Sequence, residues 1–408
     1  MKKKTVCVIG LGYIGLPTAA LLANKGFSVL GVDIKEEVVS TINEGKIHII
    51  ETDLEAFVKS AILKGQLKVS SKIHTSDVYI ICVPTPFHKN SDIPEPNLDY
   101  VLSATKEIAP FIKSGDLIIL ESTSPIGTTK KIQQTLIDRG VNLQDVHIAY
   151  CPERVLPGKI MTEIVENDRI IGGLSLISTK KIADFYRIFV SGDIFETDAK
   201  TAEMCKLAEN SFRDLNIAFA NELSMICDKQ EINVWDLIRL ANRHPRVNIL
   251  QPGTGVGGHC IAVDPWFIIS QDIENTKLIR SAREVNNYKT KWVIDKIKNA
   301  AAKHLLKSGV KPKIAILGLA FKPDIDDLRE SRALEVAETL LFEGYTIYVV
   351  EPNIQTHKKF LISNLKNAIE HSDIICALVK HREFLNPEIK EKLIKSNILD
   401  FCGCLLNE

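Results

Sequence analysis

The sequence lacks an excess of charge of either sign, because 51 Lys and Arg residues balance 51 Asp and Glu residues. A chain without net charge has no general attraction for nucleic acid or for an anionic membrane surface. It also lacks any uninterrupted apolar run of the roughly 18 residues that a membrane-spanning helix needs. We therefore expect a soluble protein with no nucleic acid and no membrane as partner, in which any anion-binding site is local.

Cysteines are few and follow no pairing pattern. The nine cysteines are scattered and odd in number, which suits a reducing cytoplasm. Cys402 and Cys404 are spaced too closely for a zinc knuckle, and no second pair accompanies them. The sequence therefore predicts a cytoplasmic location and no bound metal.

A length of 408 residues predicts two or three domains. Near the start, an apolar run leads into Gly10-x-Gly12-x-x-Gly15, a helical pattern, a second apolar run and Asp33. Glycines at this spacing let the backbone turn tightly and approach a pyrophosphate, whose charge meets the N–H groups of a helix N-terminus. An acid at Asp33 accepts from ribose hydroxyls and disfavours a 2′-phosphate, so the motif predicts NAD rather than NADP.

Further strands are predicted at 78–83, 116–120 and 145–151, separated by helical stretches, as in a doubly wound α/β sheet of the Rossmann type. Ligands of such sheets bind beyond the carboxyl ends of the strands. Hydroxyls there are expected to contact the cofactor, although they more often cap the next helix. We predict an NAD-binding domain over 1–197, with cofactor contacts at Gly10, Gly12, Tyr13, Ile14, Gly15, Asp33, Thr85 and Thr123.

Residues 198–228 contain neither Pro nor Gly and predict a long helix. Lys206, Asn210 and Arg213 share one face of it, either as a functional face or as the solvated stripe that charged residues usually form. Helices are also predicted over 234–242 and from about 274 to 305. Residues 198–305 are therefore interpreted as a helical connector.

The stretch QPGTGVGGHCIAVDPW, residues 251–266, holds four glycines within six positions. Such a density predicts positive φ or close contact with a ligand. Cys260 follows, and Asp264-Pro265 is typical of the N-cap and first residue of a helix. A helix N-terminus favours thiolate, so Cys260 is a candidate nucleophile. The alternative is a small buried cysteine in a tight turn.

A new strand pattern begins at 313–317, followed by Gly318-x-Ala320 and a second strand at 345–351. We predict a C-terminal Rossmann-like domain over 306–408. The full glycine fingerprint is missing, so this domain should bind something other than a second dinucleotide. Cations there are supplied by Lys322, Arg329 and Arg332, unless these are ordinary surface charges.

With these residues placed, the chain resembles the UDP-glucose/GDP-mannose dehydrogenase superfamily over essentially its whole length. The resemblance is carried by GLGYIGLP at 10–17, EST-x-PIGTT at 121–129, the helix with Lys206 and Asn210, PGTGVGGHCIAVDP at 252–265 and FKPDIDDLRES at 321–331. Members oxidise the C6 hydroxymethyl group of a nucleotide sugar to a carboxylate in two NAD-dependent steps. The resemblance implies the same reaction here.

The resemblance also implies roles for individual residues. Asp264 with an ordered water, and Lys206, would accept the proton of the C6 hydroxyl. Cys260 thiolate would attack the aldehyde, and the thiohemiacetal would become a thioester that water hydrolyses. Lys206 and Asn210 would stabilise the developing oxyanion.

One segment departs from the glucose-oxidising relatives, which carry Pro-Glu-Phe and a second Glu four residues beyond the first. Pro157 stands at that second position in PERVLPG, so general-base work would fall to Glu153, Asp264 or Lys206. Together with NRHPRVN at 242–248, this form is similar to the branch that oxidises UDP-2-acetamido sugars, above all UDP-N-acetyl-D-mannosamine.

The alternatives are UDP-N-acetylglucosamine as substrate, then UDP-glucose or GDP-mannose, and, outside the enzymes, an NAD-sensing binding protein that would not need Cys260. Because members dimerise through the long helix, a homodimer is expected, with His244 and Arg246 reaching across its interface. The expected UDP-sugar contacts are Arg154, Val155, Lys206, Asn210, Arg213, His244, Arg246, Gly257, Phe321, Lys322 and Arg329.

Overall fold

The structure is a computed structural model and describes residues 4–88, 93–258 and 260–406. The chain folds as two compact units, residues 1–208 with 266–270 and residues 209–265 with 271–408. Helices α8 (Ala199–Lys229) and α10 (Asp264–Ile269) contribute residues to both units. Among the described residues, no helix has the length and apolar character needed to cross a membrane. The domain boundaries expected at 197 and 305 stay a prediction.

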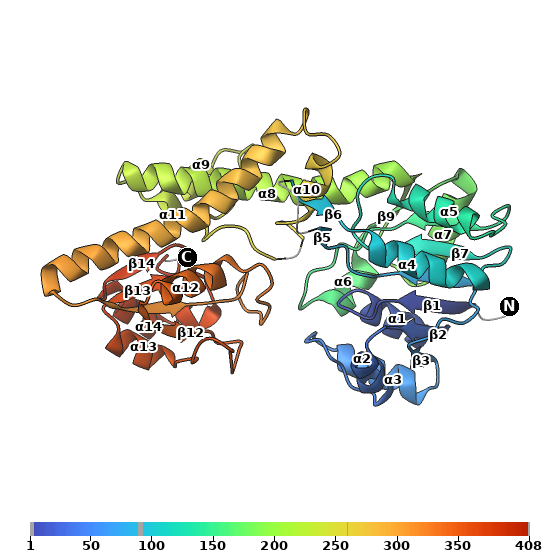
Figure 1. The fold of residues 1–408 in the computed structure, drawn as a ribbon, viewed down its shortest axis with the longest axis horizontal. Coiled ribbons are helices and arrows are strands. Elements are labelled where there is room, and N and C mark those ends of the chain that lie inside the picture. The colour runs from blue at the N-terminus through green and yellow to red at the C-terminus, as the bar shows by residue number, and fades with distance from the viewer. Residues whose placement is uncertain (1–3, 89–92, 259, 407–408) are drawn as a thin grey trace. The chain divides into compact units, whose positions relative to one another are not determined.

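The first unit is built on an eight-stranded sheet with the order β10-β9-β8-β7-β4-β1-β2-β3 (Figure 1). Strands β3, β2, β1, β4, β7 and β8 run parallel to one another. Strands β9 and β10 are parallel to each other and run in the opposite direction, because β9 pairs antiparallel with β8. The order reverses at β1 and β4, as in a doubly wound sheet. The strands are β1 Thr5–Ile9, β2 Ser28–Val32, β3 Leu67–Ser70, β4 Val78–Ile81, β7 Leu117–Leu120, β8 His147–Tyr150, β9 Arg169–Gly173 and β10 Ile194–Asp198, and a separate hairpin pairs β5 Phe87–His88 with β6 Glu95–Pro96.

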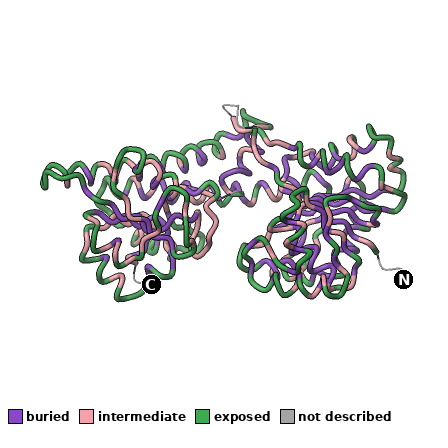
Figure 2. The backbone as a smooth tube through the Cα atoms, turned by 60° about the horizontal axis from the view of Figure 1, so that its bottom comes forward, coloured by how far each residue is buried: buried purple, intermediate pink, exposed green. Residues whose placement is uncertain are grey.

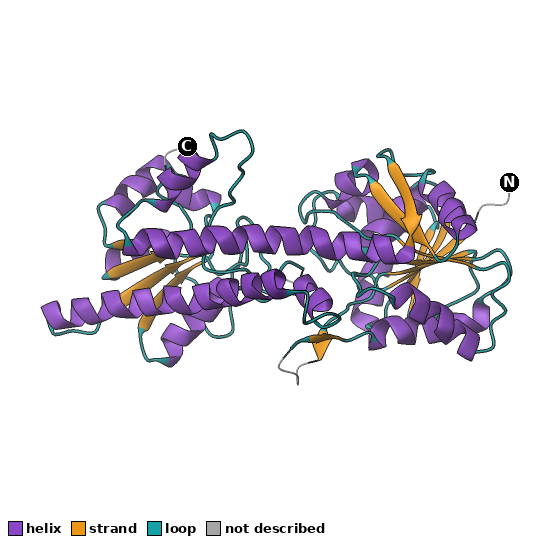
Figure 3. Ribbon diagram, turned by 90° about the horizontal axis from the view of Figure 1, so that it is seen from above, coloured by secondary structure: helices purple, strands orange, loops and turns teal. Residues whose placement is uncertain are grey.

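Helices cover both faces of this sheet (Figure 3). Every residue of β4, β7 and β8 is buried, as expected for central parallel strands that are covered on both sides (Figure 2). The predicted Rossmann-type fold is therefore confirmed. The helices of this unit are α1 Gly15–Asn24, α2 Glu36–Asn43, α3 Leu54–Leu63, α4 Asp99–Ile108, η1 Ala109–Phe111, α5 Thr128–Asp138, α6 Ile160–Glu166 and α7 Leu176–Tyr186.

The second unit contains a four-stranded parallel sheet with the order β12-β11-β13-β14. Buried apolar clusters lie on its two faces, so the predicted Rossmann-like fold is confirmed here as well. The strands are β11 Lys313–Leu317, β12 Thr346–Val350, β13 Ile374–Ala377 and β14 Ile398–Asp400. The helices are α9 Val234–Ala241, α11 Lys277–Ser308, α12 Arg332–Phe342, α13 Leu365–His371, η2 Arg382–Leu385 and α14 Pro387–Ile394.

Within the second unit, buried polar side chains join α8 to α11. Arg283 Nη1 donates to Asp214 Oδ1 at 2.6 Å, and Asn286 Nδ2 donates to the same oxygen at 2.8 Å. Asn221 Nδ2 in turn donates to Asn286 Oδ1 at 2.9 Å. Removing either Arg283 or Asp214 would leave the other charge buried without its ion-pair partner, which is strongly destabilising. The network therefore fixes the register of α11 against this part of α8.

Lys289 on α11 makes stability depend on pH. The side chain is 2% exposed, Nζ donates to Ser224 Oγ at 2.7 Å, and it lies 3.9 Å from the centroid of the Trp292 ring. Burial lowers the pKa of Lys289 to about 7. Between about pH 7 and the ordinary lysine pKa of 10.5, Lys289 is protonated in the unfolded chain and neutral in the folded chain. The unfolded state therefore binds more protons, so this residue makes the free energy of unfolding rise with pH across that window.

We expect Lys289→Met to remove this slope and to stabilise the protein at pH 7 and below by a few kcal/mol, about the order that such a pKa shift represents. Urea unfolding of both proteins from pH 6 to pH 10 measures it. The exposed Lys200→Ala serves as the control. Parallel pH profiles for wild type and Lys289→Met would contradict the assignment.

Candidate active site

The turn at 10–15 joins β1 to α1. A Cβ on Gly10, whose φ is +89°, would lie 2.7 Å from the Cys82 oxygen, and one on Gly15 would lie 1.8 Å from the Gly10 oxygen. A Cβ on Gly12 would meet no described atom within 4 Å. Gly10 and Gly15 therefore shape the turn, whereas Gly12 leaves open space beside its backbone. That space fits the approach of a pyrophosphate.

The other predicted cofactor residues lie at the carboxyl ends of the strands. Asp33 accepts from the Leu11 N–H through Oδ2 and from the Lys35 N–H through Oδ1, both at 3.0 Å. A carboxylate accepts about four hydrogen bonds, so Asp33 retains capacity for ribose hydroxyls. Thr85 Oγ1 donates to the Thr123 carbonyl at 2.6 Å and so ties the ends of β4 and β7 together. Tyr13 and Ile14 belong to the turn itself.

Glu153 lies just beyond β8 in a buried ion pair. Its Oε2 accepts from Arg169 Nη1 at 2.5 Å, and its Oε1 accepts from the Arg154 N–H at 2.7 Å. Burial, together with the charge of Glu153, raises the pKa of neighbouring Glu121. Both oxygens of Glu153 are therefore held, one by a guanidinium and one by a backbone amide. The role of Glu153 as a general base stays a prediction.

The segment PERVLPG is held by hydrogen bonds to residues elsewhere in the chain. Glu51 is buried and accepts from the N–H groups of Gly158 at 2.8 Å and Ile160 at 2.9 Å. Arg154 Nη1 donates to the Asp168 carbonyl at 3.2 Å, and Val155 packs partly buried against the core. This part of the candidate sugar site therefore has a fixed backbone, which sequence inspection did not reveal.

Helix α8 carries the predicted polar face. Lys206 is half-buried, Asn210 is 5% exposed and Arg213 is exposed, so the three do not share one environment. Asn210 Nδ2 donates to Asp264 Oδ2 at 2.5 Å, and both side chains are buried. The solvated-stripe alternative thus fails for Asn210. Arg213 is exposed as that alternative expects.

The glycine loop 252–258 packs against the loop 321–331 inside the second unit. The Gly258 N–H donates to the Arg329 carbonyl at 3.2 Å. A Cβ on Gly257 would lie 2.5 Å from the Glu330 oxygen, and one on Gly258 would lie 2.7 Å from the Phe321 ring. Two motifs about seventy residues apart in the sequence are thereby joined. The glycines serve this contact between loops, in addition to any contact with a ligand.

Cys260 follows this loop and is the exposed member of the nine cysteines, all of which are thiols. Elsewhere burial raises the pKa of the thiol, to about 12 for Cys7 and for Cys151. The alternative of a small buried cysteine therefore does not hold for Cys260. An exposed thiol beside a fixed backbone is accessible to an electrophilic carbonyl carbon.

The prediction that Asp264 is the N-cap of a helix was wrong. Asp264 is the first residue of α10, and the turn starts earlier because the N–H groups of Val263 and Asp264 both donate to the Cys260 carbonyl, at 3.0 and 2.8 Å. The carboxylate of Asp264 accepts from Asn210 Nδ2.

The remaining predicted substrate residues lie in the second unit at different exposures. Phe321 and Lys322 are half-buried, whereas Arg329 is exposed and donates to Asp327 Oδ2 through Nη2 at 2.6 Å. His244 and Arg246 are exposed in the turn after α9, where the Arg246 N–H donates to His244 Nδ1 at 3.3 Å.

Three family models match the chain. They are described as the NAD binding domain, the central domain and the UDP binding domain of the UDP-glucose/GDP-mannose dehydrogenase family, over residues 4–190, 200–288 and 315–407. The chain belongs to this family. It is therefore an NAD-dependent nucleotide-sugar dehydrogenase, and the resemblance drawn from the motifs is confirmed.

Two relatives and one solved structure show the degree of similarity within this family. UDP-N-acetyl-D-mannosamine dehydrogenase of Campylobacter jejuni is 51% identical over 414 residues, covering 97% of this chain and 98% of that protein. NDP-N-acetyl-D-galactosaminuronic acid dehydrogenase of Ralstonia nicotianae is 49% identical over 395 residues, covering 93% and 92%. The structure of UDP-D-ManNAc dehydrogenase from Pyrococcus horikoshii aligns with a TM-score of 0.90 at 39% identity, covering 99% and 96%.

For this dehydrogenase, the structure explains why the second Rossmann-like fold should not bind a dinucleotide. Glu351 follows β12 as Asp33 follows β2, and the N–H of the residue after the turn glycine donates to each acid. Glu351, however, is 2% exposed and also accepts from Ala320, Asn353 and His381. Its oxygens are occupied by the protein, so they are not available to ribose hydroxyls.

Glu203 is a second buried acid that the sequence analysis missed. Its carboxylate accepts from the Gly127 and Thr129 N–H groups at 2.6 and 2.7 Å and from Thr129 Oγ1 at 2.6 Å, which docks the first turns of α8 on the PIGTT segment. An acid three residues before Lys206 on an otherwise unremarkable helix gave no signal of this contact.

Among the described residues, one acid–thiol group is spaced for a metal ion: Asp400, Cys402 and Cys404. The Asp400 carboxylate already accepts from the N–H groups of residues 402–405. It therefore serves to close this turn.

Proposed function

We propose that the protein oxidises the C6 hydroxymethyl group of UDP-N-acetyl-D-mannosamine to the uronate. The observation that carries the proposal is the exposed Cys260, which follows a glycine loop pressed against the loop 321–331. The names of the relatives support a 2-acetamido sugar, and PERVLPG supports the same branch. One sugar, two NAD⁺ and one water give one carboxylate, two NADH and three protons.

NAD bound beside the 10–15 turn supplies the acceptor for both hydrides. The chain's own residues supply the rest of the chemistry. Asp264, through a water, and Lys206 take the proton from the C6 hydroxyl. Cys260 Sγ forms the bond to the aldehyde carbon and holds that carbon as a thiohemiacetal and then as a thioester, which water cleaves. Lys206 and Asn210 donate to the oxygen that becomes negative.

The hydrogen bond from Asn210 to Asp264 supports the role of Asn210 as a donor to the oxyanion. The amide nitrogen of Asn210 carries two hydrogens and uses one of them on Asp264 Oδ2. The bond holds the amide in one orientation, so the second hydrogen has a defined direction. Such preorganisation is what makes an oxyanion donor effective, because no reorganisation is needed as charge develops.

Counting NADH released per sugar tests the proposal. The purified protein is incubated with limiting UDP-N-acetyl-D-mannosamine, UDP-N-acetylglucosamine, UDP-N-acetylgalactosamine, UDP-glucose or GDP-mannose. We expect two NADH and one carboxylate per molecule of the first sugar and a lower kcat/KM for the others. One NADH with an aldehyde or ketone product would instead indicate a two-electron dehydrogenase. NAD binding without turnover of any sugar would indicate a sensor.

We further propose that the protein is a homodimer in the cytoplasm. Phe212, Phe219 and Ile226 on α8 are spaced by seven residues and are 69%, 51% and 50% exposed. Side chains at this spacing form one apolar stripe along a helix, which a second copy of the same stripe would cover. The nine thiols suit a reducing compartment.

We expect Phe219→Glu to convert the dimer into a monomer, because the interface would bury a carboxylate against apolar side chains. Light scattering coupled to gel filtration should change from twice the chain mass of 45.5 kDa to that mass. Phe342→Glu is the matched control, since Phe342 is 93% exposed at the end of α12. A monomeric wild type, or a dimeric Phe219→Glu, would exclude this interface.

A further inference from the structure

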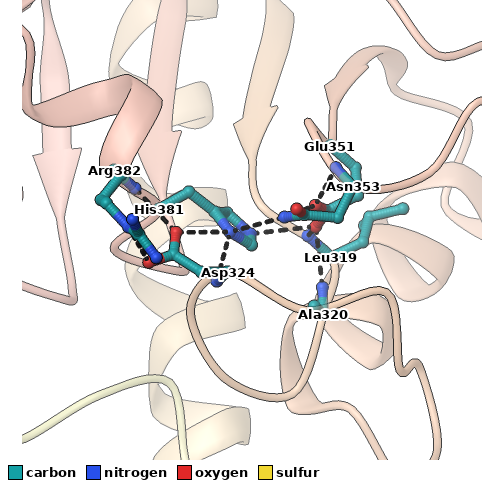
Figure 4. A network of polar contacts seen from close by, with 7 residues as sticks. All are labelled: Leu319, Ala320, Asp324, Glu351, Asn353, His381 and Arg382. Atoms are coloured by element: carbon teal, nitrogen blue, oxygen red, sulfur yellow. Dashed lines mark hydrogen bonds and ion pairs between the residues drawn. The ribbon is translucent and has the colours of Figure 1, made fainter. Parts of the chain in front are cut away.

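Three loops meet at the carboxyl ends of β11, β12 and β13 in a network of polar contacts (Figure 4). Glu351 Oε2 accepts from the N–H groups of Leu319 at 2.7 Å and Ala320 at 2.9 Å. Burial alone would raise the pKa of Glu351, but hydrogen bonds from His381 and these amides outweigh it and lower the pKa. Glu351 is thus a buried carboxylate anion that fixes the start of the loop 319–331.

The contacts of His381 define its tautomer. The N–H of Asp324 donates to His381 Nδ1 at 3.0 Å, and Asn353 Nδ2 lies 3.2 Å from the same nitrogen. Two donors aimed at Nδ1 require it to be an acceptor, so the ring proton lies on Nε2. Nε2 then donates to Glu351 Oε2 at 3.1 Å. His381 is 0% exposed, so no water competes for these bonds.

Through Nδ1, His381 holds a strained point of the loop. Asp324 has a φ of +61°, a conformation that residues other than glycine rarely adopt. Its carboxylate accepts from the Arg382 N–H at 2.9 Å and Nε at 2.8 Å, and Figure 4 shows Arg382 and His381 on either side of it. Contacts to the backbone and to the side chain together keep Asp324 in this conformation.

The same loop supports the segment that carries the thiol. Ser331 Oγ donates to the Leu319 carbonyl at 2.6 Å, which closes the loop end to end. The Gly258 N–H donates to the Arg329 carbonyl at 3.2 Å, and a Cβ on Gly258 would lie 2.7 Å from the Phe321 ring. Residues 321 and 329 of this loop therefore both contact the backbone two residues before Cys260.

We propose that His381 is a positioning residue that sets the loop 319–331 for the uridine diphosphate end of the substrate. It acts through the Asp324 N–H, and Glu351 fixes its tautomer. This inference rests on the proposed function only in taking Phe321, Lys322 and Arg329 as substrate contacts. The family model over 315–407, described as a UDP binding domain, makes UDP the appropriate probe.

Two substitutions of His381 test separately the hydrogen bond at Nδ1 and the one at Nε2. Asn places an oxygen where Nδ1 was, so His381→Asn retains the acceptor for the Asp324 N–H. Gln places an NH₂ group near Nε2, so His381→Gln retains the donor to Glu351 and loses the acceptor for Asp324. The exposed His371, at the end of α13, gives the matched control His371→Gln.

We expect His381→Gln to raise the KM for the UDP-sugar and the Kd for UDP about tenfold, the effect of one lost buried hydrogen bond. Its kcat at saturation should stay within about threefold and its NAD affinity within about twofold. His381→Asn should stay within about threefold of wild type in all four measurements. UDP titration calorimetry needs no turnover, so a wild type that binds UDP but oxidises no sugar would reject the proposed function and leave this inference testable.

Equal KM and Kd values in His381→Gln and wild type would overturn the proposal, as would equal losses in His381→Gln and His381→Asn. If neither variant folds, the ¹⁵N chemical shifts of the wild-type imidazole decide the matter. An Nε2–H tautomer with unprotonated Nδ1 is required, and a proton on Nδ1 at neutral pH would overturn the assignment.

Discussion

Replacing Cys260 with serine is expected to reduce four-electron turnover by at least about a thousandfold, the scale seen when a covalent nucleophile is removed. A serine hydroxyl is not ionised near neutral pH, and an ester at that position would not form at a useful rate. NADH release should fall to at most one per sugar, from slow first-step chemistry. Single-turnover absorbance at saturating NAD measures both values.

Cys402→Ser is the control for this experiment, because Cys402 is half-buried and bonded within its own turn. It should keep two NADH per sugar. Because Cys260 is the exposed cysteine, a limiting alkylating reagent should label it before the others. Full four-electron turnover in Cys260→Ser, or a labelling order that leaves Cys260 until last, would remove the thiol from the mechanism.

Replacing Lys206 with alanine is expected to lower kcat by about 10²- to 10³-fold, the effect of deleting one donor to a developing oxyanion. Lys206 would also lose its part in removing the hydroxyl proton. Because its contribution is made in the transition state, the Kd for NAD should change by less than about twofold. Steady-state kinetics and a separate NAD titration distinguish the two effects.

Lys200→Ala, on the exposed side of the first turn of α8, is the matched control and should leave kcat unchanged. If Lys206→Ala and Lys200→Ala behave alike, Lys206 belongs to a solvated stripe and the oxyanion has other donors. A loss in Lys206→Ala confined to NAD affinity would instead move the residue to the cofactor site.

The first glycine motif shows how much local sequence can determine. Glycine is required at positions 10 and 15, because a Cβ there would collide with nearby backbone. The backbone belongs to Cys82, just after β4, in the first case and to Gly10 in the second. Strand–turn–helix chemistry of this kind is local, so it could be predicted together with Asp33. The strands β3 and β10 were not predicted, because short segments that are partly exposed leave a weak periodic pattern. Strand β9 was missed although it is mostly buried, because its two glycines and its arginine are not typical of strands.

The candidate nucleophile was found from its glycines, but their physical role was only half predicted. The sequence indicated close approach to something, and the structure adds that loop 321–331 packs against Gly257 and Gly258. The N-cap prediction for Asp264 failed for a related reason. A side chain that meets a partner distant in sequence, here Asn210, does not follow the preference for local capping.

The glycine turn at 10–15, the two α/β folds, the long helix and the candidate nucleophile Cys260 could all be predicted from the sequence, because each depends on residue spacing along one segment. The hydrogen-bond partners of the buried acids Glu51, Glu203 and Glu351 became visible in the folded structure alone. Each accepts N–H groups from segments far away in the chain. The sequence does not reveal which distant amides a carboxylate will contact. Once the carboxylate is buried, losing those hydrogen bonds would be costly, because no water replaces them.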